Sequence, residues 1–319
     1  MNRLAVISSF LGGMKDRYLQ YTPERTLAEK FAVAGKVRGL DGLELCYPAD
    51  FEDPGLLERL LADSGLAVSA VNVRSRRTGR WLRGAFSSPR AEERAELVDD
   101  FRRAMDLAAG LGVMRISTCP LNDGHDTVFE MDYRAAYQCA EETFQAISAH
   151  DRRMRVCIEY KQSDPRTRCL FASAGETLSF CQSAGADNLG VTLDFGHALQ
   201  AGERPAQSAA LLHRAGRLFY VHLNDNDRTW DWDMVPGSFH FWEFIEFLYY
   251  LKELGCTDDW YAYDVMTKEL DTVESFQLVV DVTRRLEALA GRLERERIAA
   301  LLAERNPVHS LRYLYETLT

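Results

Sequence analysis

The sequence has no long apolar run, no excess of positive charge and no closely spaced cysteine pair, and each absence excludes a class of protein. No stretch approaches a membrane span, and the apolar stretch near residue 5 is too short for a signal peptide. A formal net charge of −10 argues against a general nucleic-acid or anionic-membrane binder. The seven cysteines contain no CxxC pair, so neither a disulfide framework nor a zinc knuckle is expected. We expect a cytoplasmic protein that binds neither nucleic acid nor membranes.

Short β-rich runs recur along most of the chain, and each is followed by a longer stretch of helical composition. The runs cover residues 4–8, 42–45, 68–73, 114–117, 156–159, 189–194, 218–222 and 260–264. Eight alternating strand and helix units are typical of a (β/α)8 TIM barrel, in which parallel strands close into a ring. An open, doubly wound sheet is the alternative fold.

The domain organisation follows from this pattern. We expect residues 1–272 to form the (β/α)8 barrel and residues 273–319 to form a C-terminal helical extension, because the tail carries spaced leucines among many charges. Such an extension packs on the barrel or on a neighbouring subunit. It therefore favours a homo-oligomer, a dimer or tetramer, and leaves a second type of subunit open.

Polar side chains terminate four successive predicted strands. Glu159, Asp194, His222 and Asp264 stand at these ends. A single carboxylate in such a place is often a helix N-cap. Four in consecutive strands of a barrel, however, meet on one rim, where a divalent cation relieves their repulsion. Oxygen ligands with one imidazole favour Mn²⁺, Mg²⁺ or Co²⁺.

A second group of ligand-type residues lies nearby in the sequence. His197 follows Asp194 by about one helical turn, and Asp231 and Asp233 form an i, i+2 pair in the stretch HLNDNDRTWDWD. These three residues, with Asp194 as a bridge, would hold a second cation. The alternative is a solvated acidic loop. We therefore expect one or two ions.

The segments that carry these residues resemble the xylose isomerase-like barrel superfamily, specifically the two-metal aldose–ketose isomerases such as xylose and rhamnose isomerases. NDGHD at 122–126 is similar to their NDGYD segment, and IEYK with DPR at 164–166 resembles their Glu-x-Lys strand end. VTLDFGH, and HLND with DWD downstream, resemble the remaining metal segments. The resemblance runs from about residue 4 to residue 266.

The resemblance implies roles for individual residues. Glu159, Asp194, His222 and Asp264 would bind a first metal, and Asp194, His197, Asp231 and Asp233 a second. Lys161 would hydrogen-bond the carbonyl oxygen of a small sugar or sugar derivative and stabilise charge developing there. The predicted catalytic residues are Lys161, Glu159, Asp264 and His125, and the predicted substrate-binding residues are Asn122, Asp123, Arg166 and Trp230.

The sequence also departs from these isomerases. Cys46 ends the second strand, where xylose isomerase has a histidine that helps to open the sugar ring. His125, at the tyrosine position of the NDGYD-like segment, is a candidate for that task, and otherwise the substrate is already open or not a free pyranose. The arginine-rich stretch from Arg74 to Arg83 follows the third strand. It would bind a sugar carboxylate or phosphate, or else be a solvated or subunit-contact loop.

Several functions agree with this pattern. The leading hypothesis is a metal-dependent sugar isomerase that uses a hydride shift. The alternative is a single-metal epimerase or lyase, including one that cleaves C-glycosides, in which Glu159 removes a proton next to a carbonyl. Nuclease chemistry fits poorly with the acidic charge. A catalytically silent scaffolding subunit is a further alternative, but it would not need the full set of predicted metal ligands.

Overall fold

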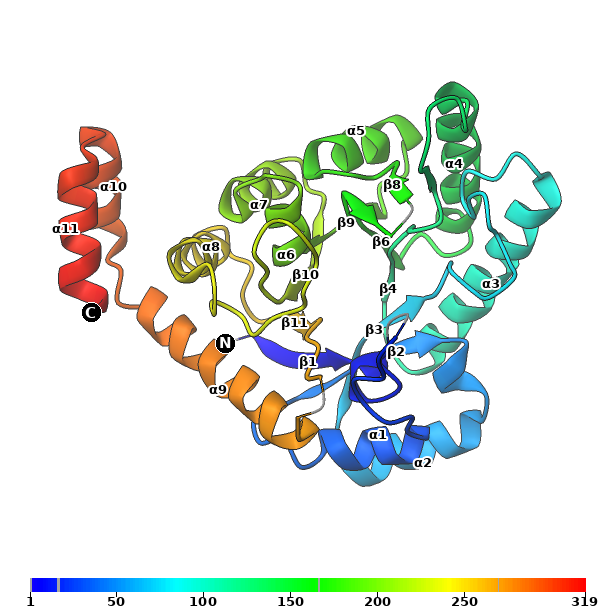
Figure 1. The fold of residues 1–319 in the computed structure, drawn as a ribbon, viewed down its shortest axis with the longest axis horizontal. Coiled ribbons are helices and arrows are strands. Elements are labelled where there is room, and N and C mark those ends of the chain that lie inside the picture. The colour runs from blue at the N-terminus through cyan, green and yellow to red at the C-terminus, as the bar shows by residue number, and fades with distance from the viewer. Residues whose placement is uncertain (1, 16–17, 166, 269) are drawn as a thin grey trace.

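A computed structural model describes residues 2–15, 18–165, 167–268 and 270–319. Within these residues, eight parallel strands close into a barrel (Figure 1). In spatial order they are β1 (Arg3–Ile7), β11 (Trp260–Tyr263), β10 (Leu218–Leu223), β9 (Leu189–Asp194), β6 (Arg155–Glu159), β4 (Arg115–Thr118), β3 (Ala67–Val73) and β2 (Gly42–Tyr47). The barrel prediction is confirmed. The open doubly wound sheet is excluded because β1 pairs with both β2 and β11.

Helices follow the strands and form the outer layer of the barrel (Figure 1). They are α1 (Leu27–Ala34), α2 (Pro54–Ser64), α3 (Ala91–Gly110), α4 (Tyr133–Ser148), α5 (Ala174–Ala184), α7 (Pro205–Arg214), α8 (Phe241–Glu253) and α9 (Thr272–Ala290). Local sequence sets several of their starts. Thr26 and Glu29 form a capping box before α1, and Asp53 caps α2 ahead of Pro54.

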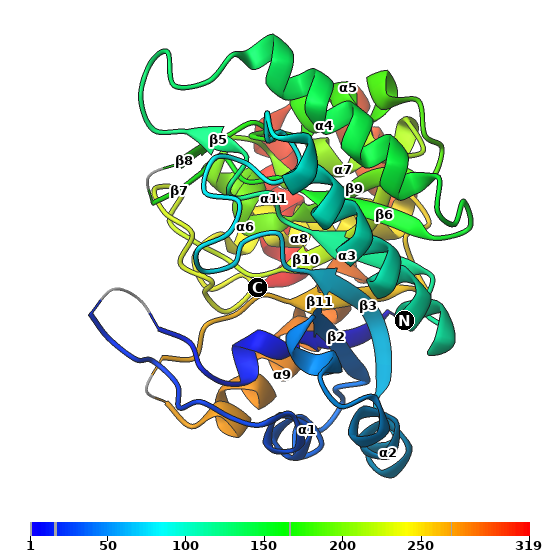
Figure 2. The ribbon, with the colours of Figure 1, turned by 90° about the vertical axis from the view of Figure 1, so that its right-hand side faces the viewer.

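The rim at the carboxyl ends of the strands carries additional short elements. Strands β5 (Gly124–His125), β8 (Thr167–Cys169) and β7 (Ser163–Asp164) pair in that order as an antiparallel sheet at one end of the barrel (Figure 2). They come from the loops after β4 and β6. The short helix α6 (Phe195–Gln200) begins directly after β9, with Asp194 as its N-cap. The longest loops of the protein thus gather where barrel enzymes place their sites.

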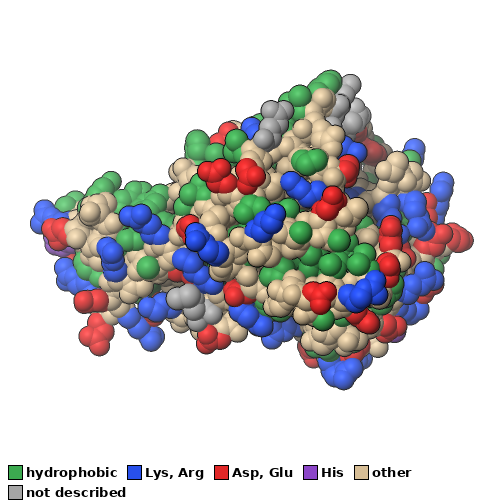
Figure 3. Space-filling view, turned by 90° about the horizontal axis from the view of Figure 1, so that it is seen from below, with side chains coloured by type: hydrophobic (Ala, Val, Ile, Leu, Met, Phe, Trp, Pro, Cys, Tyr) green, Lys and Arg blue, Asp and Glu red, His purple; other side chains and the backbone are tan. Residues whose placement is uncertain are grey.

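The C-terminal helices divide into two parts. Helix α9 packs against α8 and α1, and Arg284 on it donates a 2.9 Å hydrogen bond to the Asn2 carbonyl oxygen beside β1. Helices α10 (Arg295–Glu304) and α11 (Pro307–Leu318) project beyond the end of α9 as a hairpin (Figure 1). In the space-filling view this part forms the protrusion on the left (Figure 3). The fold confirms a helical C-terminal part. We propose that α9 belongs to the barrel and that the extension consists of α10 and α11.

Two features of composition can be compared with the structure. All seven cysteines, each among the described residues, are free thiols. Among the helices that the structure describes, none combines the length and the apolar character needed to cross a bilayer.

Candidate metal centre

Four polar side chains converge at the carboxyl ends of adjacent strands. Glu159 and Asp194 are the last residues of β6 and β9, His222 lies near the end of β10, and Asp264 directly follows β11. One potential ligand atom from each lies within 4.8 Å of the others. Each of the four residues is at most 9% exposed. The barrel therefore places the four predicted ligands around one point.

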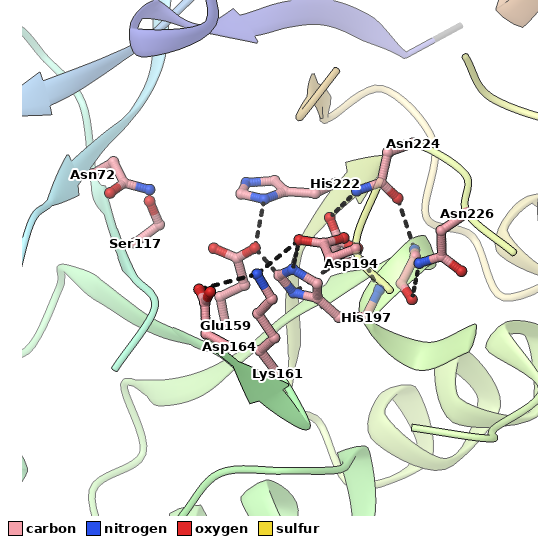
Figure 4. A network of polar contacts seen from close by, with 12 residues as sticks. Asn72, Ser117, Glu159, Lys161, Asp164, Asp194, His197, His222, Asn224 and Asn226 are labelled. Atoms are coloured by element: carbon pink, nitrogen blue, oxygen red, sulfur yellow. Dashed lines mark hydrogen bonds and ion pairs between the residues drawn. The ribbon is translucent and has the colours of Figure 1, made fainter. Parts of the chain in front are cut away.

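Several of these atoms make no hydrogen bond. Glu159 Oε1, His222 Nδ1 and Asp264 Oδ1 are buried and have no hydrogen-bond partner among the described residues. His222 Nδ1 and Glu159 Oε1 face each other at 3.4 Å (Figure 4). Buried polar atoms nearly always form hydrogen bonds in folded proteins, so a group of buried ligand atoms without them needs an explanation. A divalent cation supplies one, and these residues fit such an ion.

The electrostatics of the group point the same way. Burial, together with the negative charge of Glu159, raises the pKa of Asp264 to about 8. Burial also raises the pKa of Asp194. For Glu159, burial opposes ionisation, but the facing His222 outweighs it and lowers the pKa to about 2. The site thus disfavours negative charge on Asp194 and Asp264, and a divalent cation would relieve this.

Glu44 lies behind the group and was not predicted from the sequence. It is fully buried in β2, and its Oε2 lies 3.0 Å from His222 Nε2. Burial opposes its ionisation, but His222 lowers its pKa below the usual value, so the carboxylate accepts the Nε2 proton. This contact leaves His222 Nδ1 directed at Glu159. A carboxylate behind a metal-binding histidine is a common arrangement that fixes the tautomer and the ring orientation.

A second cluster lies next to the first. His197 Nε2 is 3.2 Å from Asp231 Oδ2, and Lys161 Nζ is 2.8 Å from the same oxygen. His197 Nδ1 lies 3.3 Å from Glu159 Oε1, so the two clusters touch. Burial disfavours charge on His197, but Asp194 and Asp231 outweigh it and raise the pKa to about 10. Lys161 likewise stays cationic, because Asp231 and Asp164 overcome its burial and raise its pKa.

The predicted second metal set is only partly assembled. Asp231 Oδ1 and Asp233 Oδ1 are buried without hydrogen-bond partners among the described residues. Within the described part of the chain, however, neither aspartate belongs to a group of ligand atoms within 4.8 Å of one another. His197 instead groups with Glu159 and Cys119. Burial raises the pKa of the Cys119 thiol well above its usual value, so Cys119 stays protonated.

The segment HLND holds Asp194 in place. Asn224 Nδ2 donates a 3.0 Å hydrogen bond to Asp194 Oδ2, while Asn224 Oδ1 accepts one from the Gly196 amide at 2.7 Å (Figure 4). A Cβ at residue 196 would lie 2.6 Å from that amide oxygen, so glycine is required for this close approach. Asp225 accepts hydrogen bonds from the Phe239 and His240 amides, which ties down the long loop.

The remaining predicted residues lie elsewhere. Asn122 Nδ2 donates to the Trp81 carbonyl oxygen, and Asp123 is fully buried with Oδ1 bonded to the amide and hydroxyl of Ser87. We therefore propose that Asp123 positions a loop and does not touch substrate. The His125 ring contacts Tyr133, and among the described residues it does not belong to the metal-ligand group. The half-buried Trp230 lies in a turn held by Asp227, and Arg166 lies outside the described residues.

The order of these segments along the chain can be compared with known proteins. A family model described as xylose isomerase-like TIM barrel matches residues 32–278. The chain belongs to this family.

Relatives within the xylose isomerase-like family include both isomerases and epimerases. The chain is 28% identical over 187 residues to a xylose isomerase from Thermus thermophilus, an alignment that covers 57% of this chain and 48% of that protein. It is 27% identical over 207 residues to an L-ribulose 3-epimerase from Mesorhizobium japonicum, covering 64% of this chain and 65% of the relative. The chain thus aligns with about half to two thirds of these proteins.

Solved structures show the same barrel. A 3-keto-D-glucoside 4-epimerase from E. coli superposes with a TM-score of 0.67 at 14% identity, covering 89% of this chain and all of the other. A structure of L-ribulose 3-epimerase gives a TM-score of 0.65 at 17% identity, covering 95% and 98%. At these identities the likeness shows the fold alone.

Proposed function

We propose that this protein is a sugar isomerase that interconverts an aldose and a ketose and depends on a divalent cation, with Mn²⁺, Mg²⁺ and Co²⁺ as candidates. Glu159, Asp194, His222 and Asp264 would hold the ion. When bound, the cation would polarise the sugar carbonyl and bind a neighbouring oxygen. The observation that carries the proposal is Lys161, a buried cation beside this group whose Nζ lies 2.8 Å from Asp231.

Lys161 would act on the substrate through its ammonium group. It lies two residues after Glu159, at the rim (Figure 4). Asp231 and Asp164 flank Nζ at 2.8 and 3.3 Å, which holds the ammonium in place and keeps it charged. A fixed donor of this kind stabilises negative charge that develops on a carbonyl oxygen as hydrogen moves between adjacent carbons.

A second ion would involve Asp194, His197, Asp231 and Asp233. The unpartnered oxygens of the two loop aspartates support such a site. Burial and the neighbouring charge of Asp231 raise the pKa of Asp233 well above its usual value, and a second cation would relieve this repulsion. The first site is the better supported of the two, because its four ligand atoms already lie close together.

A single-metal epimerase or lyase is the second candidate. It is favoured by the contacts of Asp231, whose charge is balanced by Lys161 and His197. In this reaction Glu159 would remove a proton next to a carbonyl, and Asp264, across the site, would return one. Cleavage of a C-glycoside is a version of this chemistry, with Trp230 against an aromatic group. The epimerases that the chain resembles have a glutamate where it has Asp264.

Isotope transfer separates the two reactions. The Mn²⁺-loaded protein is incubated in D₂O with a panel of aldoses and ketoses, and products are analysed by NMR. A hydride shift yields product without deuterium on the reacting carbons, whereas proton abstraction introduces deuterium. Glu159→Gln and chelator-treated protein serve as controls. Deuterium incorporation would overturn the isomerase proposal in favour of the epimerase or lyase, and turnover that survives in both controls would overturn both.

The expected assembly and location remain predictions. A homo-oligomer, a dimer or tetramer, would be seen by light scattering after size-exclusion chromatography. Purification from the source cells would show whether a second type of subunit accompanies the chain and whether the protein is cytoplasmic.

A further inference from the structure

A cavity of about 640 Å³ opens on the same rim as the metal-ligand group, and we call it the arginine cavity. The loop 76–89 between β3 and α3 forms one wall, and residues 122–125 with the first turns of α4 form the other. Its volume is within the range of sites that bind small molecules. It has room for a substantial part of a substrate and not merely for a single ion.

One carboxylate connects the arginine cavity to the proposed catalytic group. Asp164 Oδ2 lies 3.7 Å from Nη1 of Arg76, in the cavity wall, and 3.3 Å from Nζ of Lys161. Lys161 in turn contacts Asp231. The cavity wall at Arg76 thus lies one side chain away from Lys161, close enough for one substrate molecule to reach both.

The cavity wall carries a cluster of arginines, two of which have no close carboxylate partner among the described residues. Four arginines line it, namely Arg76, Arg77, Arg80 and Arg83. Arg77 and Arg80 are paired with Asp100 and Glu96 at 2.9 and 2.6 Å. Arg83 is exposed and has no carboxylate partner among the described residues, and the contact of Arg76 with Asp164 is long.

Two acidic residues also line the cavity, and each has other partners. Glu130 accepts hydrogen bonds from the Asp126 and Thr127 amides, and Asp132 caps α4 through the Arg134 and Ala135 amides. One oxygen of each carboxylate is therefore engaged with backbone donors, and Asp132 Oδ2 also pairs with Arg134 Nη2 at 3.3 Å. An incoming anion would find free donors on the arginines, and guanidinium groups bind carboxylates and phosphates in a bidentate manner.

The arginine loop is held in place before any ligand binds. The guanidinium carbons of Arg77 and Arg80 lie 5.2 and 4.7 Å from the ring centroid of the buried Trp81. The Trp81 indole donates to the Glu93 carbonyl oxygen at 3.3 Å, and Asn122 donates to the Trp81 carbonyl oxygen at 3.1 Å. A binding surface that is already ordered loses less conformational entropy when a ligand binds.

We propose that the arginine cavity binds an anionic group, a carboxylate or phosphate, carried by the substrate on the end remote from the reacting carbons. The inference rests on the proposed sugar chemistry, and it narrows the substrate class to acidic or phosphorylated sugars. Arg83 and Arg76 would make the direct contacts, while Trp81 and Asn122 position the loop.

Binding to metal-free protein tests this inference without any turnover. Calorimetric titrations at low salt compare glucuronate, glucose 6-phosphate and neutral glucose. We expect at least one anionic sugar to bind about tenfold or more tightly than glucose, and Arg83→Gln to abolish most of this difference. Arg102→Gln is the matched control, since Arg102 is an exposed arginine on α3 paired with Asp99 outside the cavity. The preferred probe distinguishes carboxylate from phosphate.

The outcomes separate this inference from the proposed function. Equal affinity for charged and neutral sugars, or an Arg83→Gln protein that binds the anions as the wild type does, would overturn the inference even if isomerisation of neutral sugars is found. Selective anion binding that is lost in Arg83→Gln and kept in Arg102→Gln supports the inference even if no isomerase activity is detected.

Discussion

Replacing Glu44 with glutamine removes a negative charge from behind His222 while keeping nearly the same side-chain size. Glu44 Oε2 contacts His222 Nε2 at 3.0 Å, and Oε1 accepts hydrogen bonds from Asn72 and Ser117. A glutamine has one acceptor oxygen in place of two. If it accepts from His222, its amide group faces the Asn72 donor, which lies 2.9 Å from the present Oε1. The substitution therefore leaves one buried donor badly placed in either orientation.

The expected magnitude follows from the role of such partners in metal sites. Loss of a group that orients a ligating histidine typically weakens metal affinity about 10- to 100-fold. This corresponds to about 1.4–2.7 kcal/mol of binding free energy. The loss arises because His222 is less firmly oriented and its Nδ1 is a poorer electron donor once the negative charge behind the ring is gone.

The assay is calorimetric titration of Mn²⁺ into chelator-stripped protein, with Asp50→Asn as a matched control. Asp50 is also a buried carboxylate, but its contacts are with Ser8, the Cys46 amide and Lys30. We expect both variants to melt at lower temperature and only Glu44→Gln to lose Mn²⁺ affinity. If folded Glu44→Gln binds Mn²⁺ as the wild type does, Glu44 supports the fold alone and the reasoning is refuted.

Two further predictions concern Lys161 and protons. Lys161→Met should still bind the first Mn²⁺ ion but lower kcat by roughly 100- to 1,000-fold, as loss of a donor to a developing oxyanion does; an unchanged kcat would remove Lys161 from the reaction. Because the pKa of Asp264 is raised to about 8, Mn²⁺ binding at pH 7 should release protons, and calorimetric heats should depend on the ionisation enthalpy of the buffer. The Asp264 carboxyl contributes its full stabilisation to the metal-free fold below about pH 4, and this contribution is lost as the pH rises through about 8. The increase in Tm caused by Mn²⁺ should therefore be larger at pH 8 than at pH 6. Buffer-independent heats or an equal Tm gain would contradict this.

The sequence predicts the barrel and the first ligand group for a physical reason. Parallel strands bring their carboxyl ends to one rim, so polar residues such as Glu159 and Asp194 that end successive apolar runs must meet there. No knowledge of loop paths is needed for this step.

Contacts that depend on strand register or on the path of a loop could not be predicted from the sequence in this way. Glu44 lies 178 residues from His222 and sits in an apolar strand, and only the closed barrel directs both side chains into one interior. The sequence signal that could have pointed to Glu44 was a charged residue inside the otherwise apolar run GLELC. The pairing of Lys161 with Asp231 depends on the loop after β10, where Asp233 adopts a φ of 48° that sequence periodicity does not predict.

Metal stoichiometry tests the central claim most directly. Chelator-stripped protein is titrated with Mn²⁺ as wild type, as Glu159→Gln/Asp264→Asn and as Asp231→Asn/Asp233→Asn. The account predicts that the first double variant loses the tightest site, whereas the second keeps it and loses only a weaker one. A wild-type protein that binds no ion, or a tight site that survives in Glu159→Gln/Asp264→Asn, would contradict it.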